Sequence, residues 1–275
     1  MIQASVIIPT YNRKDLLSRA LRSVLQQVTD TKKVSVTPKG VCHQIEVIVV
    51  DDGSTDGTRE MIEKDFPSVQ YFHQRNQGPA AARNRGIERA RGPWIAFLDS
   101  DDEWLPGKLQ TQLDFFERHP DFFIHQTEEI WIRNGKRVNP MKKHQKHGGW
   151  IFEKCLPLCL ISPSAVVMHR RIFDEVGLFD ETLPACEDYD LWLRIACRFP
   201  VGLDEKPYVM KYGGHADQRS HEFPAMDRFR IYSLKKILNS GRLNPVQTEA
   251  ARKVLEEKEK IYNQGALKRS GIIVL

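Results

Sequence analysis

"IEVIVV", residues 45–50, is the stretch of sequence that decides the fold. Its residues are mostly β-branched and apolar, and they do not alternate with polar ones. This pattern is typical of a parallel strand that is covered on both faces. Two acids, Asp51 and Asp52, follow the run directly. The sequence therefore predicts a buried strand of an α/β sheet, with polar side chains placed where that strand ends.

The segments around this run alternate between strand and helix patterns. The first helix is indicated by apolar residues that recur at i, i+1, i+4, i+5, i+8 and i+9, which form one helix face. Such a βαβα order predicts a doubly wound, mostly parallel sheet. The expected elements are strands at 4–9, 45–50, 69–73 and 94–98, and helices at 16–28, 57–65 and 79–90.

The second half of the chain is less regular. Asn134-Gly135 between strand-like flanks is typical of a type I′ hairpin. Residues 29–44 are expected to form a surface insertion without an assigned role, and 141–149 a basic, flexible loop. The other expected elements are helices at 108–119 and 187–199, a strand at 164–169 and polar helices after 221.

Composition bounds the class of protein. A chain of 275 residues with 41% hydrophobic content is ordinary for a soluble globular protein. The net charge of +5 favours anionic ligands or an anionic membrane surface. Nucleic-acid binding is not expected, because it would need a basic patch with stacking aromatic residues.

The cysteines and the apolar runs suggest a compartment. Five cysteines show no disulfide framework, which favours a reducing, cytoplasmic environment. The first strand begins near Ala4, which leaves no room for a signal peptide. No apolar run approaches the roughly 18 residues that a membrane-spanning helix needs.

Polar residues follow each predicted parallel strand, where ligands bind in such sheets. The most crowded set is "DSDDE", residues 99–103, after the strand at 94–98. In its D-x-D pattern, Asp99 and Asp101 can share one divalent cation that also takes phosphate oxygens, which suits Mg²⁺ or Mn²⁺. Such a cation would offset the repulsion between the acids. The pattern alone is weak, because acid pairs in loops are common.

Five motifs in a fixed order carry a resemblance to a known family. Together they resemble glycosyltransferase family 2, the inverting nucleotide-sugar enzymes of GT-A fold, over roughly residues 4–200. The motifs are "VIIPTYNR", "VIVVDDGSTDGT", "NQGPAAARNRG", "FLDSDDEW" and "EDYDLWLR".

The resemblance implies an α/β GT-A fold. Residues 1–103 would form a Rossmann-like half that binds the nucleotide sugar. Residues 104–220 would form the mixed half, which binds the acceptor and holds the catalytic base. Residues 221–275 would be a C-terminal helical extension.

The resemblance also implies a nucleotide pocket. Tyr11 could lie against a pyrimidine face. Asp52 would accept a hydrogen bond from the base, typically uracil N–H, whereas Asp51 fits the following turn. Asp99 would contact the ribose, or the metal through water. The implied nucleotide-binding residues are Pro9, Thr10, Tyr11, Arg13, Asp52, Arg83, Asp99 and Ser100.

The metal ligands implied by the resemblance are Asp101 as the most direct one, Asp99, and His215 as a third ligand of Mn²⁺ or Mg²⁺. For His215 the alternative is a polar surface residue. The catalytic base implied by "EDYDLWLR" is Asp188, with Glu187 as the second choice. The positive end of a helix dipole would keep such an acid ionised, as a base requires.

The implied activity is the inverting transfer of a hexosyl or N-acetylhexosaminyl group. The donor would be a nucleotide diphosphate sugar, with UDP leading and GDP or dTDP open. The acceptor would be a hydroxyl of a glycan or lipid-linked saccharide, as in cell-envelope polysaccharide synthesis. The polar C-terminal helices could pair subunits or rest on the inner face of a membrane.

The main alternative is a catalytically inactive module that binds a nucleotide sugar. Two other enzyme classes lack their motifs here. A sugar nucleotidyltransferase needs a glycine-rich loop after the first strand, where this chain has "TYNRKD". A dehydrogenase needs G-x-G-x-x-G at that place. A glycosidase, which also uses two carboxylates, is disfavoured by the motifs of the base pocket.

Overall fold

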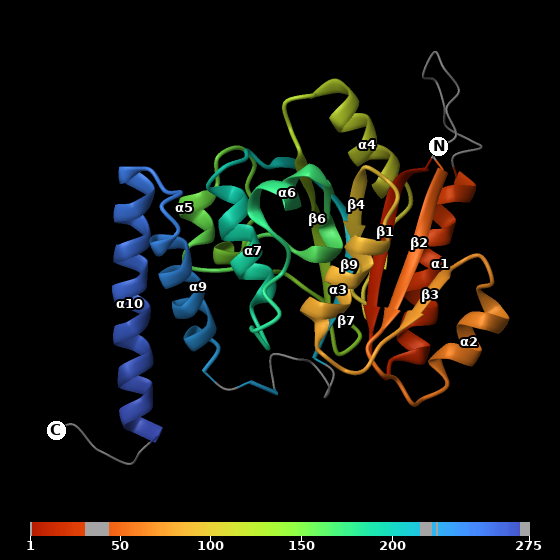
Figure 1. The fold of residues 1–275 in the computed structure, drawn as a ribbon, viewed down its shortest axis with the longest axis horizontal. Helices are drawn as coiled ribbons and strands as arrows, with labels where there is room; N and C mark the ends of the chain where they lie inside the picture. The colour runs from red at the N-terminus through yellow and green to blue at the C-terminus, as the bar shows by residue number, and fades with distance from the viewer. Residues whose placement is uncertain (1, 31–43, 215–221, 224, 270–275) are drawn as a thin grey trace.

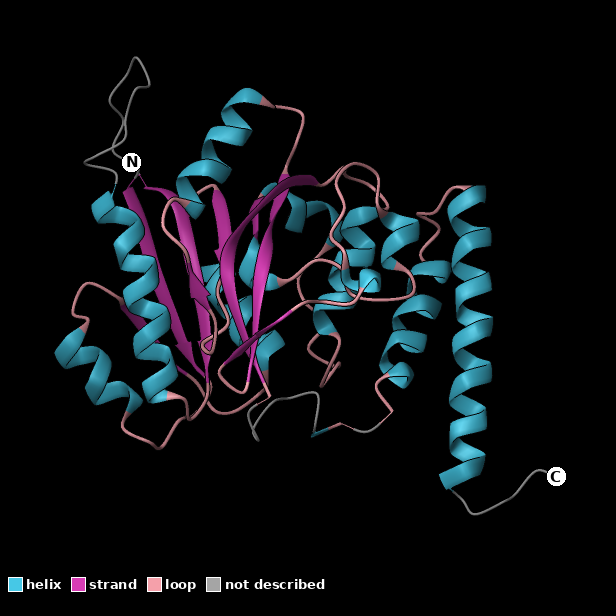
Figure 2. Cartoon of the chain, turned by 180° about the vertical axis from the view of Figure 1, so that it is seen from behind, coloured by secondary structure: helices cyan, strands magenta, loops and turns pink. Residues whose placement is uncertain are grey.

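The computed structural model describes residues 2–30, 44–214, 222–223 and 225–269. Most of the predicted insertion at 29–44, together with Cys42 and His215, lies outside these residues. A curled sheet of nine strands runs through the molecule, with helices on both of its faces (Figures 1 and 2). In the described part of the chain, no helix is both long enough and apolar enough to span a bilayer.

The first half confirms the doubly wound parallel sheet. Its strands lie in the order β3-β2-β1-β4, and all of these pairs are parallel. Helices connect consecutive strands, as a parallel sheet requires. The strands are β1 (Ile2–Thr10), β2 (Gln44–Asp51), β3 (Gln70–His73) and β4 (Trp94–Phe97), and the helices are α1 (Lys14–Asp30), α2 (Thr58–Asp65) and α3 (Pro79–Arg89).

Both faces of β1 are buried, which explains its continuous apolar sequence. Ile8 belongs to the core on the α1 side, where Leu17 also lies, and Ile7 belongs to the core on the α3 side. The approach of α3 to β1 depends on Gly86, because a Cβ there would lie 2.3 Å from Ile7 Cγ2. The helix that carries Arg83 is thereby held directly against the central strand.

The second half adds a mixed set of strands, in the order β4-β8-β6-β9-β5. The Asn134-Gly135 hairpin is confirmed, since both residues have positive φ and Arg133 pairs with Lys136. The strands are β5 (Glu103–Trp104), β6 (Ile124–Arg133), β7 (Lys136–Val138), β8 (Val166–His169) and β9 (Gly202–Gly213). The helices are α4 (Lys108–Arg118), α5 (Phe152–Cys155), α6 (Arg171–Val176), α7 (Glu187–Ala196), α9 (Asp227–Asn239) and α10 (Pro245–Arg269), with 3₁₀ turns η1 (Lys142–His144) and η2 (Pro163–Ala165).

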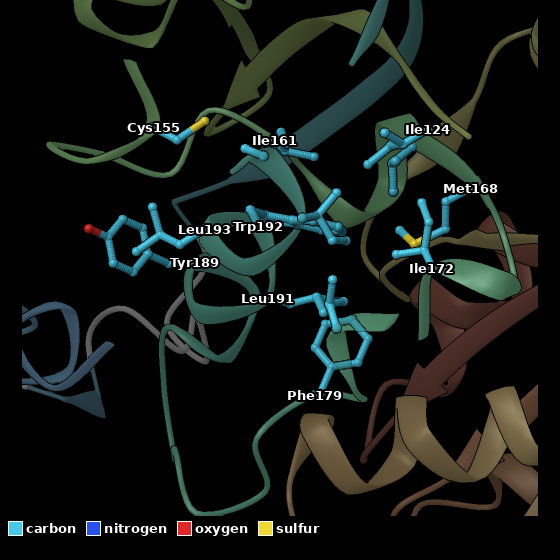
Figure 3. Packing of buried hydrophobic residues seen from close by; sticks show 14 of the residues in the cluster. Ile124, Cys155, Ile161, Met168, Ile172, Phe179, Tyr189, Leu191, Trp192 and Leu193 are labelled. Atoms are coloured by element: carbon cyan, nitrogen blue, oxygen red, sulfur yellow. The ribbon is translucent and has the colours of Figure 1, made fainter. Parts of the chain in front are cut away.

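The helix α7 is the centre of the larger core. Leu191, Trp192 and Ile195 are fully buried, as their helical spacing predicts. Figure 3 shows Leu191 and Phe179 pointing toward one another beneath this helix. The extension packs on the same side, because α9 contacts α7 and α10 lies along α9 (Figure 1). This packing fixes the position of the acids at the N-terminus of α7.

A buried carboxylate ties the first two strands to the loop before β4. Glu46 accepts hydrogen bonds from Ser5 Oγ (2.6 Å), Gln70 Nε2 (2.8 Å), and Arg91 N and Nε (2.6 and 2.8 Å). Burial alone would raise the pKa of Glu46, but these donors lower it to about 2. The ionised form is therefore part of the folded structure.

We expect Glu46→Gln to lower the free energy of unfolding by about 3 kcal/mol at pH 7. Because the pKa of Glu46 is lower in the folded state, its stabilisation is complete above the unfolded value of about 4.5. It is lost as the pH falls toward 2. Urea unfolding of both proteins between pH 7 and pH 2.5 should show the difference shrinking on acidification. A difference that does not depend on pH would contradict this assignment.

Candidate active site

The carboxyl ends of β1 and β2 form one joined edge. The Thr10 carbonyl accepts the N–H of Asp52 at 2.9 Å. Asn12, in the left-handed region at φ 49°, accepts the N–H of Thr55 through Oδ1 and donates its own N–H to Ser54 Oγ, both at 2.8 Å. The two strand ends thus position the predicted base-pocket segments side by side.

The two acids after β2 have different surroundings. Asp51 accepts the N–H of Ser54 (2.8 Å) and the hydroxyl of Tyr71 (2.6 Å), which confirms its role in the turn. Asp52 accepts Gln74 Nε2 and the backbone N–H groups of Gln77 and Gly78, all within 2.9 Å. It therefore holds the segment before α3. A carboxylate offers about four lone-pair positions, so Asp52 can still accept one more donor.

The end of β1 holds a buried hydroxyl that no atom of the described residues satisfies. Within the described residues, Thr10 Oγ1 has no hydrogen-bond partner. Buried polar groups are almost always paired, so the Thr10 hydroxyl is open to a hydrogen bond with an ordered water or a bound ligand. Pro9, just before it, is buried, whereas Tyr11, just after it, is 47% exposed. The segment from Pro9 to Tyr11 thus presents one unsatisfied polar atom and one open ring.

The crowded acids after β4 are kept apart by separate partners. Arg83 Nη2 donates to Asp99 Oδ1 at 2.7 Å, and Arg13 Nη1 donates to Asp101 Oδ2 at 2.8 Å. Ser100, between the two acids, is buried. The sequence suggested that a cation offsets the repulsion. The structure shows that two arginines already do so.

The other two acids of this cluster hold the loop in place. Asp102 is buried and accepts Ser164 Oγ (2.6 Å) and the N–H of Tyr212 (3.0 Å). Ser164 Oγ in turn accepts the N–H of Asp99 at 3.1 Å. Burial, and then the charge of Asp101, raise the pKa of Asp102 well above its ordinary value. Glu103 accepts the hydroxyl of Tyr212 at 3.0 Å.

One guanidinium joins the D-x-D motif to the acids of α7. The side chain of Arg83 is 6% exposed, and its Nη1 donates to Glu187 Oε1 at 2.7 Å while Nη2 holds Asp99. Burial alone would lower the pKa of Arg83, but the charges of Asp99 and Glu187 raise it above its usual range. Burial raises the pKa of Glu187, although Arg83 opposes the shift. Arg83 and Glu187 are 104 residues apart in the sequence, so no local pattern could have predicted their ion pair.

Asp188 is the less engaged of the two acids at the N-terminus of α7. It is half-buried, and its Oδ1 accepts the N–H of Tyr189 at 2.7 Å. Within the part of the chain that the structure describes, its Oδ2 accepts a hydrogen bond only from the Cys159 thiol, at 3.4 Å. By contrast, Asp190 is buried and accepts hydrogen bonds from Nε and Nη2 of Arg194, four residues further along α7.

The residues of the D-x-D motif fit a divalent cation in their chemistry. Asp99 and Asp101 are partly exposed carboxylates at the carboxyl end of β4, and oxygen ligands of this kind suit Mg²⁺ and Mn²⁺. Among the described residues, no group of three or more His, Cys, Asp or Glu side chains is arranged to hold a metal ion. Further ligands would come from bound phosphate, from water or from outside the described residues, where His215 lies.

A cavity of about 210 Å³ adjoins this motif. It is lined by Asp101, by the hairpin turn at Asn134 and Gly135, and by Arg19 and Tyr212. Arg19 lies 3.8 Å above the Tyr212 ring and donates to the Asp101 carbonyl at 2.6 Å. The hairpin of the second half therefore lies beside the D-x-D motif of the first.

Comparison with known proteins supports one family. The model of glycosyl transferase family 2 matches residues 5–177. An uncharacterised glycosyltransferase of Rickettsia bellii is 36% identical over 202 residues, which is 73% of this chain and 27% of that protein. The chain thus spans about a quarter of the length of that relative.

Two characterised proteins are also similar. The Escherichia coli UDP-Glc:alpha-D-GlcNAc-diphosphoundecaprenol beta-1,3-glucosyltransferase WfaP is 32% identical over 198 residues, which is 70% of this chain and 69% of that one. The structure of S. aureus TarS 1–349 in complex with UDP-GlcNAc has a TM-score of 0.71 at 20% identity. It covers 94% of this chain and 71% of that one. At that identity the likeness shows the fold alone, which is the predicted α/β architecture.

Proposed function

The chain belongs to glycosyl transferase family 2, and on this basis we propose that it transfers a sugar from a nucleotide diphosphate sugar to a saccharide hydroxyl. The observation that carries the proposal is the Asp99–Arg83–Glu187 bridge. It places a D-x-D motif, suited to the donor diphosphate, next to an acid pair suited to the acceptor. A module that only binds the donor would need no such link.

The proposed donor is a UDP sugar carrying a hexosyl or N-acetylhexosaminyl group. Asp52 retains an acceptor position that suits the N–H of uracil. The unsatisfied Thr10 hydroxyl and the exposed Tyr11 ring lie at the adjoining strand end. WfaP is named for its use of UDP-Glc, and the TarS structure contains UDP-GlcNAc, so both similar proteins point to the same nucleotide.

The proposed cofactor is Mn²⁺ or Mg²⁺, held by Asp101 and Asp99, with His215 as a third ligand. Such an ion, when bound, neutralises charge on the departing diphosphate. Arg83 and Arg13 hold the two carboxylates at the carboxyl end of β4 through ion pairs of 2.7 and 2.8 Å. Their fixed positive charge also favours a diphosphate at this edge of the sheet.

The proposed chemical step is a single in-line displacement with inversion at the anomeric carbon. Asp188 removes the proton from the acceptor hydroxyl, because it is half-buried and its Oδ2 accepts only a long hydrogen bond from the Cys159 thiol within the described residues. Glu187 is committed to Arg83 and acts by positioning it. The acceptor oxygen forms the new bond as the bond to the diphosphate oxygen breaks on the opposite face.

The proposed acceptor is a glycan or a lipid-linked saccharide of the cell envelope. WfaP is named for a lipid-linked acceptor, GlcNAc-diphosphoundecaprenol. We assign donor binding to residues 1–103, acceptor binding and the base to 104–220, and a supporting role to the helices after 221. The four described cysteines are free thiols, which favours the cytoplasm. A homo-oligomer formed through the C-terminal helices is part of the proposal, and nucleic acid is not.

Thermal unfolding with a panel of nucleotide sugars tests the donor and the metal together. We expect UDP sugars with Mn²⁺ to raise Tm by roughly 5–10 °C at about 100 times Kd, from a linkage of about 2.7 kcal/mol. Asp101→Asn should lose the part of the shift that requires Mn²⁺. The matched control Asp204→Asn, at an acid of β9 that accepts the N–H of Lys206, should keep all of it.

Product formation decides between the enzyme and the inactive module. Transfer of sugar to a saccharide acceptor, with inverted anomeric configuration by NMR, supports the proposal. A UDP-dependent shift without transfer or donor hydrolysis across a broad acceptor panel would favour the binding module. A larger shift with GDP or dTDP sugars would overturn the choice of nucleotide.

A further inference from the structure

The loop between β7 and α5 is basic and carries two exposed apolar residues. From Arg133 to Lys154 the sequence has seven lysines and arginines and one acid, Glu153. Six of these seven are exposed, and Lys146 alone is buried. Trp150 is 67% exposed and Met141 is 61% exposed, the two largest values among the exposed aromatic and methionine side chains. Figure 1 shows the segment running from β7 to α5.

The sequence suggested a flexible loop here. In the structure, several residues of this loop contact the sheet. The His144 ring lies 5.2 Å from that of Trp131. Lys146 is buried against Glu129 (3.5 Å) and Gln126 (3.3 Å). Gly149 pairs with Val201 in an isolated bridge. Because these residues face the sheet, the ones between them are held outward.

A second effect of these contacts is electrostatic. The carboxylate of Glu129 neutralises Lys146 and also faces Lys211, and both lysines lower its pKa to about 2 against the effect of burial. The buried charges are therefore balanced within the fold. The exposed lysines have one acid in the same stretch of sequence, Glu153 of α5.

The outward residues all belong to the segment between β7 and the end of α5. We name the Lys–Trp surface as Met141, Lys142, Lys143, Trp150 and Lys154. Its inner contacts run along β6 from Trp131 to Gln126, a length of about 17 Å at 3.3 Å per residue. Lys154 Nζ lies 3.2 Å from His147 Nδ1, so Lys154 joins the Trp150 end of this surface.

We propose that the Lys–Trp surface docks the protein on an anionic phospholipid bilayer. Lysines next to a bilayer are attracted by its negative surface potential. Indole rings settle at the level of the lipid headgroups, and a methionine side chain can enter the apolar layer below. A basic segment with an exposed Trp and an exposed Met therefore matches an anionic bilayer surface. It offers no row of stacking aromatics for a nucleic acid.

The Lys–Trp surface adjoins the hairpin that lies beside the candidate active site. It continues into the β6–β7 hairpin, whose turn lines the cavity beside Asp101. Docking would bring this edge of the catalytic half to the plane of the headgroups, where the saccharide of the lipid-linked acceptor proposed above is anchored. The docking itself does not rest on the proposed function, and its test uses no sugar transfer.

Sedimentation with vesicles tests the proposal. The full chain should bind vesicles of 70% phosphatidylcholine and 30% phosphatidylglycerol, and not vesicles of phosphatidylcholine alone. Lys142→Gln/Lys143→Gln should weaken binding about 25-fold, at about fivefold for each cation. The control Lys253→Gln/Lys260→Gln removes the same charge from exposed positions of α10 and should bind as the unmodified chain does.

Fluorescence gives an independent readout. Binding should shift the emission of Trp150 to the blue, and Trp150→Phe should abolish the shift while keeping most of the binding. The proposal is overturned if the two vesicle types bind equally, or if the α10 pair weakens binding as much as the loop pair. It is also overturned if duplex DNA or RNA binds the Lys–Trp surface and phosphatidylglycerol vesicles do not.

Discussion

Asp188→Asn is expected to lower the rate of sugar transfer by about 10²–10⁴-fold, the usual contribution of a general base. The substitution keeps the shape of the side chain and an acceptor for Tyr189 N, while the Cys159 thiol retains the carbonyl of Ile161 as its acceptor. Folding and donor binding should therefore be unchanged. Initial rates with saturating UDP sugar, together with Tm and the Kd of UDP, measure all three quantities.

Two further variants make this test specific. Glu256→Gln removes an exposed acid of α10 and should leave the rate unchanged. Glu187→Gln should lower Tm as well as the rate, because it breaks the ion pair with Arg83. If Asp188→Asn retains a rate within threefold of the unmodified enzyme while Glu187→Gln loses it without loss of Tm, the base is Glu187.

Arg83→Met is expected to lower the free energy of unfolding by about 3–5 kcal/mol, the usual cost of removing one partner of a buried ion pair. It leaves Glu187 buried without its cation and removes the partner of Asp99. A loss of this size is a large part of the total stability of a typical domain. Urea unfolding, followed by fluorescence and circular dichroism, measures the change.

A double-mutant cycle separates charge from packing. Arg83→Met/Glu187→Gln should regain part of the lost stability, because no ionised carboxylate then remains unpaired at Glu187. Arg83→Lys keeps one charge but cannot donate to both acids in a fixed geometry. Its free energy of unfolding should therefore lie between that of the unmodified protein and that of Arg83→Met. A loss below about 1 kcal/mol for Arg83→Met would show that the bridge adds little to stability.

The parallel half of the sheet could be predicted because its elements obey local rules. The apolar run at 45–50, the helix face at 16–28 and the turn residues between them each have a period that fits one element. The hairpin at Asn134-Gly135 was predictable for the same reason. The path of the loop at 141–149 was not, since it is set by contacts with Trp131, Glu129 and Val201, of which Val201 is distant in sequence.

The candidate site divides in the same way. Asp99, Asp101 and Asp188 could be singled out because their motifs follow a strand or begin a helix. Ser164, Tyr212 and Cys159 carried no signal, because each reaches the site through the fold and not through a motif. No sequence pattern separates such polar residues from ordinary surface positions.

The amino-acid sequence by itself determined which residue types stand at the end of each strand and at the start of α7, because these positions follow from local period and turn chemistry. Only the tertiary structure decided how their charges are shared. Arg83 holds Asp99 and Glu187 together, Arg13 takes Asp101, and Asp188 is left with a thiol. The physical reason is distance: electrostatic and hydrogen-bond energies depend on a few ångströms of separation in space, which the order of residues along the chain does not contain.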